Sequence, residues 1–278
     1  MNNELKGKSA LVTGAGGGGP GGQGKGIALC LARAGVDVAV NDIDKEGAER
    51  TAAEIRAMGH RAMAVVADVT KEAEVNAMVA LVVKEWGGID ILVNNVGLGL
   101  PILVEDMTAE DWDVVVKRNL YAPFFCCKAV LPTMKSRGGG KIINVSSMAG
   151  KTITALTGAS YTAAKAGLLG LTRQLAFEVG PYGINVNAIC PAGVVSSYRP
   201  TPPEQLEAMA KRIPIRRVTM SEDIGEAAVF LASERARTIT GISLDVEGGT
   251  SNSMGDWEGY VKRHKEYVAN RKQGASAE

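Results

Sequence analysis

The chain has 278 residues, an apolar content of 46% and a formal net charge of +1. This is the composition of an ordinary globular protein with a sizeable core, and the charge gives no basis for a nucleic-acid partner or an anionic membrane surface. Two histidines and four cysteines without metal-ligand spacing argue against a zinc-dependent mechanism. With no signal-peptide pattern and no membrane span, we expect a cytoplasmic protein with reduced thiols.

The N-terminal part has the pattern of half a dinucleotide-binding unit. Residues 9–13 form a short apolar run, and a glycine-rich stretch from Gly14 to Gly26 follows it. A helix is expected to begin at Ile27 and to end at Gly35. Glycines let backbone amides approach a pyrophosphate, and a helix N-terminus attracts its negative charge. A flexible surface loop has the same composition, so the glycines alone are weak evidence.

The second expected strand, residues 36–41, leads directly into Asp42, which lies sixteen residues after Gly26. A dinucleotide-binding fold places an acidic residue near this position to bind the adenosine ribose hydroxyls. The carboxylate would repel a 2′-phosphate, and no arginine follows at once to offset it. Asp42 therefore predicts NAD rather than NADP as the cofactor. The alternative is an aspartate that only serves a turn.

Strand-like and helical patterns alternate through the rest of the chain. Further strands are expected at 61–67, 89–93, 141–145, 184–190 and 242–246, and helices at 45–58, 72–86, 108–138, 161–179 and 221–232. This alternation predicts a parallel sheet covered on both faces, and right-handed crossovers make it doubly wound. We expect an α/β chain with a single-domain Rossmann fold of about seven strands over residues 1–249, followed by a C-terminal extension, 250–278.

Tyr161 and Lys165 are four residues apart on an expected helix and share one of its faces. A neighbouring ammonium is expected to lower the tyrosine pKa from ~10 by roughly 1–3 units, which would make the phenol a proton acceptor near neutral pH. On its own this spacing is also that of a solvent-facing helix pair.

Several motifs in a fixed order resemble the short-chain dehydrogenase/reductase family over roughly residues 8–249. They are Thr13-Gly14 with Gly24-x-Gly26, Asn94-Asn95-Val96-Gly97, Asn119, Ser147, Tyr161-x-x-x-Lys165 and the segment from Pro191 onward. The resemblance implies an NAD(P)-dependent oxidoreductase that acts on CH–OH groups and interconverts a secondary alcohol and a ketone. It also implies self-association as a homo-oligomer, with a tetramer as the leading expectation.

The resemblance assigns roles to individual residues. Tyr161 would exchange the proton, Ser147 would hold the substrate oxygen, Lys165 would lower the tyrosine pKa and hold the nicotinamide ribose, and Asn119 would anchor a water. The implied cofactor contacts are Gly14, Gly24, Gly26, Ile27, Asp42, Asp68, Val69, Asn95, Tyr161, Lys165, Val194 and Ser196. No metal ligand is expected.

The chain departs from the family pattern in ways that leave alternatives open. The glycine loop is about six residues longer than the family's, with Gly16 to Gly22 inserted around Pro20, so the glycines that contact phosphate are not fixed. Ser146 stays a minor candidate for the role of Ser147. A catalytically silent dinucleotide-binding sensor or scaffold is a second class of function. The unusual loop also suggests an enoyl reductase, although the serine before the tyrosine speaks against it.

Substrate choice is expected to depend on residues 197–219, where basic residues exceed acidic ones by three. Arginines suit carboxylate or phosphate recognition, so Arg199, with Ser147 and Tyr161, is a candidate contact for a polar or anionic substrate. Sugars, polyols, hydroxy acids and acyl thioesters all stay open. The alternative is a solvated helix face, with Arg217 bracing the fold.

The C-terminal extension carries an aromatic stripe at helical spacing, which includes Trp257, Tyr260 and Tyr267. An amphipathic helix of this kind needs a surface to cover. We expect it to pack near an active-site mouth, either its own or that of a neighbouring subunit.

Overall fold

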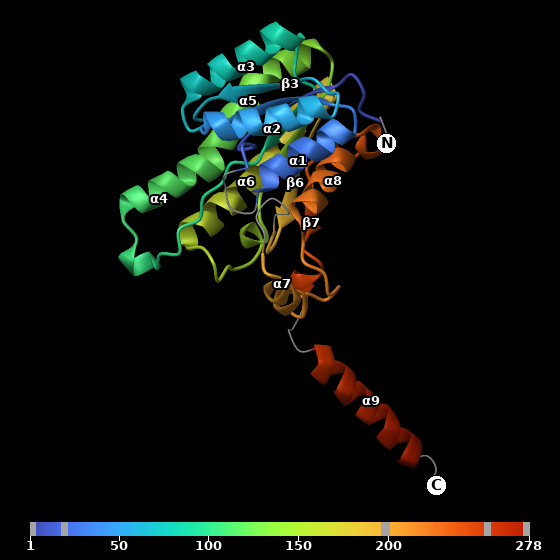
Figure 1. The fold of residues 1–278 in the computed structure, drawn as a ribbon. Helices are drawn as coiled ribbons and strands as arrows, with labels where there is room; N and C mark the ends of the chain where they lie inside the picture. Colours follow the sequence, from blue (N-terminus) through green and yellow to red (C-terminus); the bar gives the residue numbers. More distant parts are fainter. Residues whose placement is uncertain (1–3, 18–21, 196–200, 253–256, 275–278) are drawn as a thin grey trace.

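A seven-stranded sheet with the order β3-β2-β1-β4-β5-β6-β7 forms the centre of the molecule (Figure 1). The computed structural model describes residues 4–17, 22–195, 201–252 and 257–274. All neighbouring strands pair in parallel. The strands are β1 Ser9–Val12, β2 Asp37–Asp42, β3 Ala62–Val66, β4 Ile91–Asn94, β5 Gly140–Val145, β6 Ile184–Pro191 and β7 Ser243–Val246. The predicted doubly wound sheet of about seven strands is confirmed.

Helices cover both faces of the sheet because successive strand residues point to opposite sides. On β1, Ala10 and Val12 belong to one core cluster and Leu11 to the other. The first cluster packs under α1 (Gln23–Arg33), α2 (Lys45–Ala57) and α8 (Ser221–Ala232). The second packs under α3 (Glu72–Trp86), α5 (Ala122–Ser136) and the C-terminal half of α6 (Ala159–Val179). No helix among the described residues is long and apolar enough to cross a membrane.

The long helical region expected from Thr108 to about Gly138 is interrupted. It consists of α4 (Ala109–Val116), a π-helical turn at Lys117–Tyr121, and α5. Thr108 caps α4, since its hydroxyl oxygen accepts a hydrogen bond from the Asp111 amide at 3.1 Å. The π turn contains Asn119, and such turns are frequent at functional sites.

The order of the strands reverses between β1 and β4, which are neighbours in the sheet. The connections that leave the carboxyl ends of these two strands run to opposite sides, and a crevice opens between them. Asp42 ends the neighbouring β2, and Asn94 ends β4. This edge is therefore the place where a dinucleotide is expected to bind.

Short elements complete the chain between the main helices and strands. Single turns of 3-10 helix lie at Val104–Asp106, Met148–Gly150, Gly180–Tyr182, Glu234–Ala236 and Thr250–Asn252, and α7 spans Pro203–Ala210.

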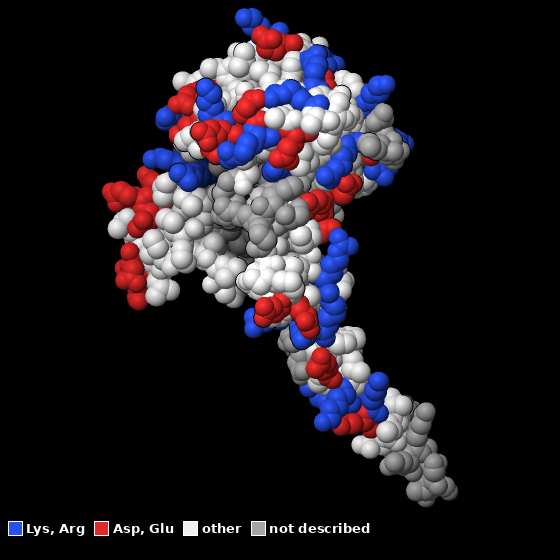
Figure 2. Space-filling model, in the orientation of Figure 1, with Lys and Arg blue, Asp and Glu red and all other residues white. Residues whose placement is uncertain are grey.

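Helix α9 (Trp257–Gly274) extends away from the body of the molecule (Figure 1). The rings of Trp257 and Tyr260 stack at 5.7 Å, and the two residues are 62% and 48% exposed. An ion pair of 4.0 Å between Arg216 and Glu258 links its first turn to the body, and residues of both charge signs lie along it (Figure 2). The expected helix is present, but it does not cover the active-site mouth of its own chain.

Candidate active site

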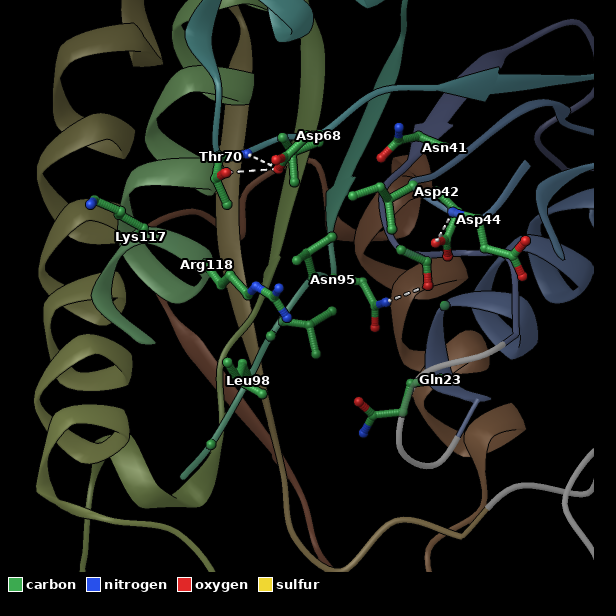
Figure 3. Close-up of a pocket in the computed structure, with 18 of the residues that line it drawn as sticks. Gln23, Asn41, Asp42, Asp44, Asp68, Thr70, Asn95, Leu98, Lys117 and Arg118 are labelled. Atoms are coloured by element: carbon green, nitrogen blue, oxygen red, sulfur yellow. Dashed lines mark hydrogen bonds between the residues drawn. The ribbon is translucent and has the colours of Figure 1, made fainter. Parts of the chain in front are cut away.

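A cleft of about 730 Å³ opens along the carboxyl edge of the sheet (Figure 3). Asp42 and Asp68 line one end of it, and Tyr161 and Lys165 line the other. The glycine loop after β1 and the segment after β4 border its middle, so the cleft suits an elongated ligand with chemically different ends.

The first turn of α1 packs directly on the loop that follows β1. Gly22 precedes the helix with a φ of 56°, and Gly14 has a φ of 64°, both in the left-handed region that favours glycine. A Cβ on Gly24 would lie 2.2 Å from the Gly14 carbonyl oxygen. The helix begins at Gln23, four residues before the expected start at Ile27, because Gly24 permits this close approach.

Two residues of the expected cofactor set lie away from the cleft. A Cβ on Gly26 would lie 2.8 Å from Cβ of Ser221, which shows that Gly26 lets α1 pack closely on α8. Ile27 is fully buried in the core. Neither lines the cleft, so the structure shows a packing role for both residues, and their contact with the cofactor stays a prediction.

The Asp42 carboxylate is held by backbone amides at the end of β2. Its Oδ2 accepts from the Gly16 amide at 2.8 Å, and its Oδ1 accepts from the Asp44 amide at 3.1 Å. These donors orient the carboxylate at the cleft wall, and within the described part of the chain no lysine or arginine forms an ion pair with it. The geometry suits hydroxyl groups as further donors.

Asn95 and Asp68 present polar groups to the same cleft (Figure 3). Asn95 donates from Nδ2 to the carbonyls of Thr13 and Gly14, each at 3.1 Å, while its buried Oδ1 has no hydrogen-bond partner. Burial alone would raise the pKa of Asp68, but hydrogen bonds from Thr70 and nearby positive charges hold it below its usual value. An orphaned amide oxygen, an oriented carboxylate and a glycine cradle together fit a nicotinamide dinucleotide.

At the other end of the cleft, α6 positions Tyr161 and Lys165. Lys165 is 3% exposed, its Nζ donates to the Val145 carbonyl at 2.8 Å, and burial lowers its pKa to about 8. Burial raises the pKa of Tyr161, and a hydrogen bond with Ser147 offsets this only in part. The expected lowering of the Tyr161 pKa is therefore not found. The Lys165 ammonium lies 5.6 Å from the tyrosine ring centroid and is directed to a backbone carbonyl instead.

Two serines follow β5, and the structure separates their roles. The hydroxyl of Ser146 donates to the Lys165 carbonyl at 3.0 Å and is buried against α6. Ser147 lies close enough to the Tyr161 hydroxyl to lower its pKa, and the Ser147 hydroxyl oxygen accepts from the Ala149 amide at 3.1 Å. Ser147, and not Ser146, therefore lies beside the tyrosine hydroxyl.

Asn119 joins the π turn to the segment after β4. Its Nδ2 donates to the carbonyls of Val115 at 2.8 Å and Leu98 at 2.7 Å. A Cβ on Gly97 would lie 3.0 Å from Asn119 Oδ1 and 3.5 Å from Lys165 Nζ, so both side chains converge on this glycine. The structure thus brings Asn119, Lys165 and, through Lys165, Tyr161 to one place.

The carboxyl end of β6 is described only in part. Val194 is half-buried against the core, and the Val195 amide donates to the Thr219 carbonyl at 2.9 Å. Val194 does not line the cleft. Ser196 and Arg199 lie outside the described residues, so their assigned contacts with cofactor and substrate stay predictions.

Several cations of the basic segment are engaged with carboxylates. Lys211 pairs with Glu207 at 2.9 Å, and Arg217 pairs with Asp223 at 2.7 Å. The second pair joins the segment to the first turn of α8, as the bracing alternative for Arg217 predicts. For these two residues the structure supports a solvated, structural role rather than an anion site.

The cleft also contains residues that the sequence patterns did not single out, among them Gln23, Thr70, Leu98, Lys117 and Arg118. For Arg118 a signal was present, since it immediately precedes Asn119. The direction of the Arg118 side chain depends on the π turn, and a hydrophobic periodicity in the sequence does not reveal a π turn.

Comparison with known proteins decides the family. Residues 19–251 match a family model described as enoyl-(acyl carrier protein) reductase. The chain belongs to the short-chain dehydrogenase/reductase family. Members of this family bind a nicotinamide dinucleotide, in agreement with the cleft, and this chain is an oxidoreductase of that family.

Relatives and solved structures agree with this placement. The chain is 41% identical over 244 residues to the 3-oxoacyl-(acyl-carrier-protein) reductase FabG of Staphylococcus aureus, covering 87% of this chain and 97% of that one. An uncharacterized oxidoreductase of Thermotoga maritima is 39% identical over 253 residues, 88% of this chain and 98% of the other. A putative short-chain alcohol dehydrogenase from Sinorhizobium meliloti superposes with a TM-score of 0.82 at 37% identity, covering 91% of this chain and all of that structure.

Proposed function

We propose that this short-chain dehydrogenase/reductase interconverts a secondary alcohol and a ketone, with NAD as its cofactor. The observation that carries the proposal is that Ser147 lies close enough to the Tyr161 hydroxyl to lower its pKa, at one end of a cleft whose other end holds the Asp42 carboxylate. The nicotinamide supplies hydride transfer when the dinucleotide is bound. A silent sensor or scaffold would not require a tyrosine, a serine and a lysine to meet in this way.

The protein's own groups manage the proton and the substrate oxygen. Because burial raises its pKa, Tyr161 is held as the neutral phenol, the form that donates a proton to a carbonyl oxygen in reduction. Ser147 supplies a second hydrogen bond to that oxygen as charge develops. Lys165 stays mostly protonated at pH 7, since its pKa is about 8, and its charge favours the phenolate left after proton transfer. Asn119 fixes the wall beside Lys165.

Substrate class is proposed from the relatives and the site together. The name of the Staphylococcus aureus relative indicates a 3-oxoacyl thioester, a ketone-bearing substrate, whereas the family model carries the name of an enoyl reductase. The Tyr161–Ser147 pair presents two hydroxyls, which suits a carbonyl or alcohol oxygen better than a carbon–carbon double bond. We therefore propose a polar keto or hydroxy substrate, with sugars, polyols, hydroxy acids and acyl thioesters as the classes to compare.

A turnover screen tests this function. NAD reduction is followed with secondary alcohols, sugars, polyols and hydroxy acids, and NADH oxidation with matched 3-oxoacyl and 2-enoyl thioesters. We expect turnover with at least one alcohol–ketone pair. Turnover of the enoyl thioester alone would assign an enoyl reductase, and NAD binding without any turnover would favour the silent sensor.

Replacement of Asp42 by alanine tests the cofactor. The wild-type enzyme is expected to have a higher kcat/KM with NAD than with NADP, because the carboxylate binds ribose hydroxyls and repels a 2′-phosphate. Asp42→Ala should remove most of this preference, chiefly through KM. The check is steady-state kinetics with both cofactors on one substrate. Equal or better efficiency of the wild type with NADP would contradict the assignment.

We also propose a cytoplasmic homo-oligomer, with a tetramer as the leading state, in which α9 packs on a neighbouring subunit. The exposed aromatic stripe supports this, since a helix in a protein gains most of its stability by packing an amphipathic face, and large exposed apolar patches mark interaction sites. Removal of residues 254–278 is expected to lower the Tm of the oligomer or its mass by light scattering, with the affinity for NAD unchanged. A full-length chain that is monomeric at micromolar concentration would refute the oligomer, and identical behaviour of both forms would make α9 an appendage.

A further inference from the structure

The π turn that holds Asn119 also carries two neighbouring cations, Lys117 and Arg118, whose side chains take opposite directions. In Figure 3 the ammonium group of Lys117 points away from the middle of the cleft, whereas the guanidinium of Arg118 points toward Asn95. Lys117 pairs with Asp113 on the preceding turn at 3.7 Å. Lys117 and Arg118 are neighbours in the sequence, but only the guanidinium of Arg118 points toward the middle of the cleft.

Arg118 makes no hydrogen bond or ion pair with any residue that the structure describes. Its charge nevertheless acts on Asp68, whose pKa it helps to lower, so the guanidinium is near that end of the cleft. In the view of Figure 3 it lies between Asp68 and Leu98, with Asn95 in front of it. An extended cation directed into a binding cleft with no protein partner is available for a ligand.

The other groups of the cleft restrict which part of a dinucleotide this cation can meet. Asp42 presents its carboxylate where ribose hydroxyls are expected, and the close packing of Gly14 and Gly24 forms the place for the pyrophosphate. Asp42 lies across the cleft from Arg118 in Figure 3, and so does Gln23, the neighbour of Gly24 in the sequence. The group that stays between Asp68 and Arg118 is the flat adenine base.

We infer that Arg118 covers the adenine ring of the bound dinucleotide and is a cofactor-affinity residue particular to this chain. The inference rests on the proposed dinucleotide cofactor. A planar guanidinium stacks on an aromatic face, and lysine, with its compact ammonium, does so less well. Val69, which follows Asp68, also lines the cleft and offers apolar contact to the ring. Because Arg118 and Asn119 are adjacent in one π turn, a bound adenine also steadies the turn that positions Asn119.

Fragment binding tests the inference without any turnover. NADH binding is followed by its fluorescence, and adenosine, AMP and nicotinamide mononucleotide are titrated as competitors. In Arg118→Met the Kd for NADH and for adenosine should rise by about 3- to 30-fold, the range that a partly desolvated cation–π contact provides. The Kd for nicotinamide mononucleotide should not change. Arg118→Lys should fall between Arg118→Met and the wild type.

Lys128→Met is the control, since Lys128 lies on α5, pairs with Glu72 and does not line the cleft, and its replacement should leave all four affinities unchanged. The Tm of ligand-free Arg118→Met should equal that of the wild type, while the rise in Tm on adding NADH should shrink.

Three outcomes would overturn the inference. If AMP and NADH lose affinity while adenosine does not, Arg118 contacts phosphate; if no affinity changes, it faces solvent. If Tm and nicotinamide mononucleotide affinity both fall, its role is structural. None of these outcomes depends on the reaction. If the enzyme oxidised no alcohol, the adenosine affinities would still test the role of Arg118. If Arg118→Met changed no affinity, the proposed reaction would be unaffected.

Discussion

Tyr161→Phe is expected to lower kcat by ~10²–10⁴-fold, the usual contribution of general acid–base catalysis. The substitution removes the hydroxyl that lies beside Ser147 and keeps the ring that lines the cleft. The Kd for NADH should therefore change by less than about threefold, because the ring still fills the same wall. The measurement is kcat and KM on the best substrate of the screen, with NADH fluorescence for binding.

The matched control is Tyr182→Phe, a tyrosine that is 45% exposed on the 3-10 turn after α6 and does not line the cleft. Tyr182→Phe should leave both kcat and the Kd for NADH unchanged. A Tyr161→Phe enzyme that retains more than about a tenth of the wild-type rate would remove Tyr161 from the reaction. If Tyr161→Phe lost both NADH binding and turnover, the result would instead indicate that the cleft had collapsed.

Lys165→Met is expected to abolish turnover and, at pH 7, to stabilise the fold. Burial lowers the Lys165 pKa from 10.5 to about 8, and this shift corresponds to about 3 kcal/mol that the charged side chain costs the folded state. The substitution also removes the hydrogen bond from Lys165 to the Val145 carbonyl, and this loss destabilises the folded state by about 1 kcal/mol. A net stabilisation of about 2 kcal/mol should be measurable by urea unfolding, as an increase in midpoint with unchanged m.

The pH dependence distinguishes this cause from better packing. Between the folded pKa of about 8 and the unfolded value of 10.5, the unfolded chain binds more protons than the native one, so wild-type stability rises with pH in this window. The methionine variant lacks this titration. Its advantage should be full at pH 7 and nearly absent at pH 9.5. An advantage that is independent of pH, or a destabilised variant at pH 7, would refute the burial cost.

Most of the fold was predictable because buried parallel strands have continuous apolar runs. All seven expected strands are found within two residues of their predicted bounds, since the residues that must be buried define them. The order of motifs also led to the family. Two features of the site were also predictable, because a parallel sheet brings the carboxyl ends of its strands to one edge. Asp42 at the end of β2 lines the cleft, and Ser147 after β5 lies beside Tyr161.

What could not be predicted depends on tertiary contacts. The start of α1 at Gln23 requires Gly24 to touch the Gly14 carbonyl, a contact that composition alone does not show. The Tyr161 pKa depends on burial more than on its spacing from Lys165, so helical geometry alone gave the wrong direction. The aromatic stripe of α9 predicted a helix, but its spacing does not show that α9 extends away from the body of the chain (Figure 1).

The π turn at Lys117–Tyr121 also has a consequence for chimeras built from relatives. An α-helix advances by about 100° per residue, and a π turn accommodates one residue more than the flanking α-helical register allows. Exchange of α4 for a segment one residue shorter would convert this turn to α-helix, because the extra residue that the π turn accommodates would be gone. Asn119 would then lose its hydrogen bond to the Leu98 carbonyl, although neither Asn119 nor any of the other proposed catalytic residues had been changed. Residue count in this helix is therefore as much a part of the active site as residue identity.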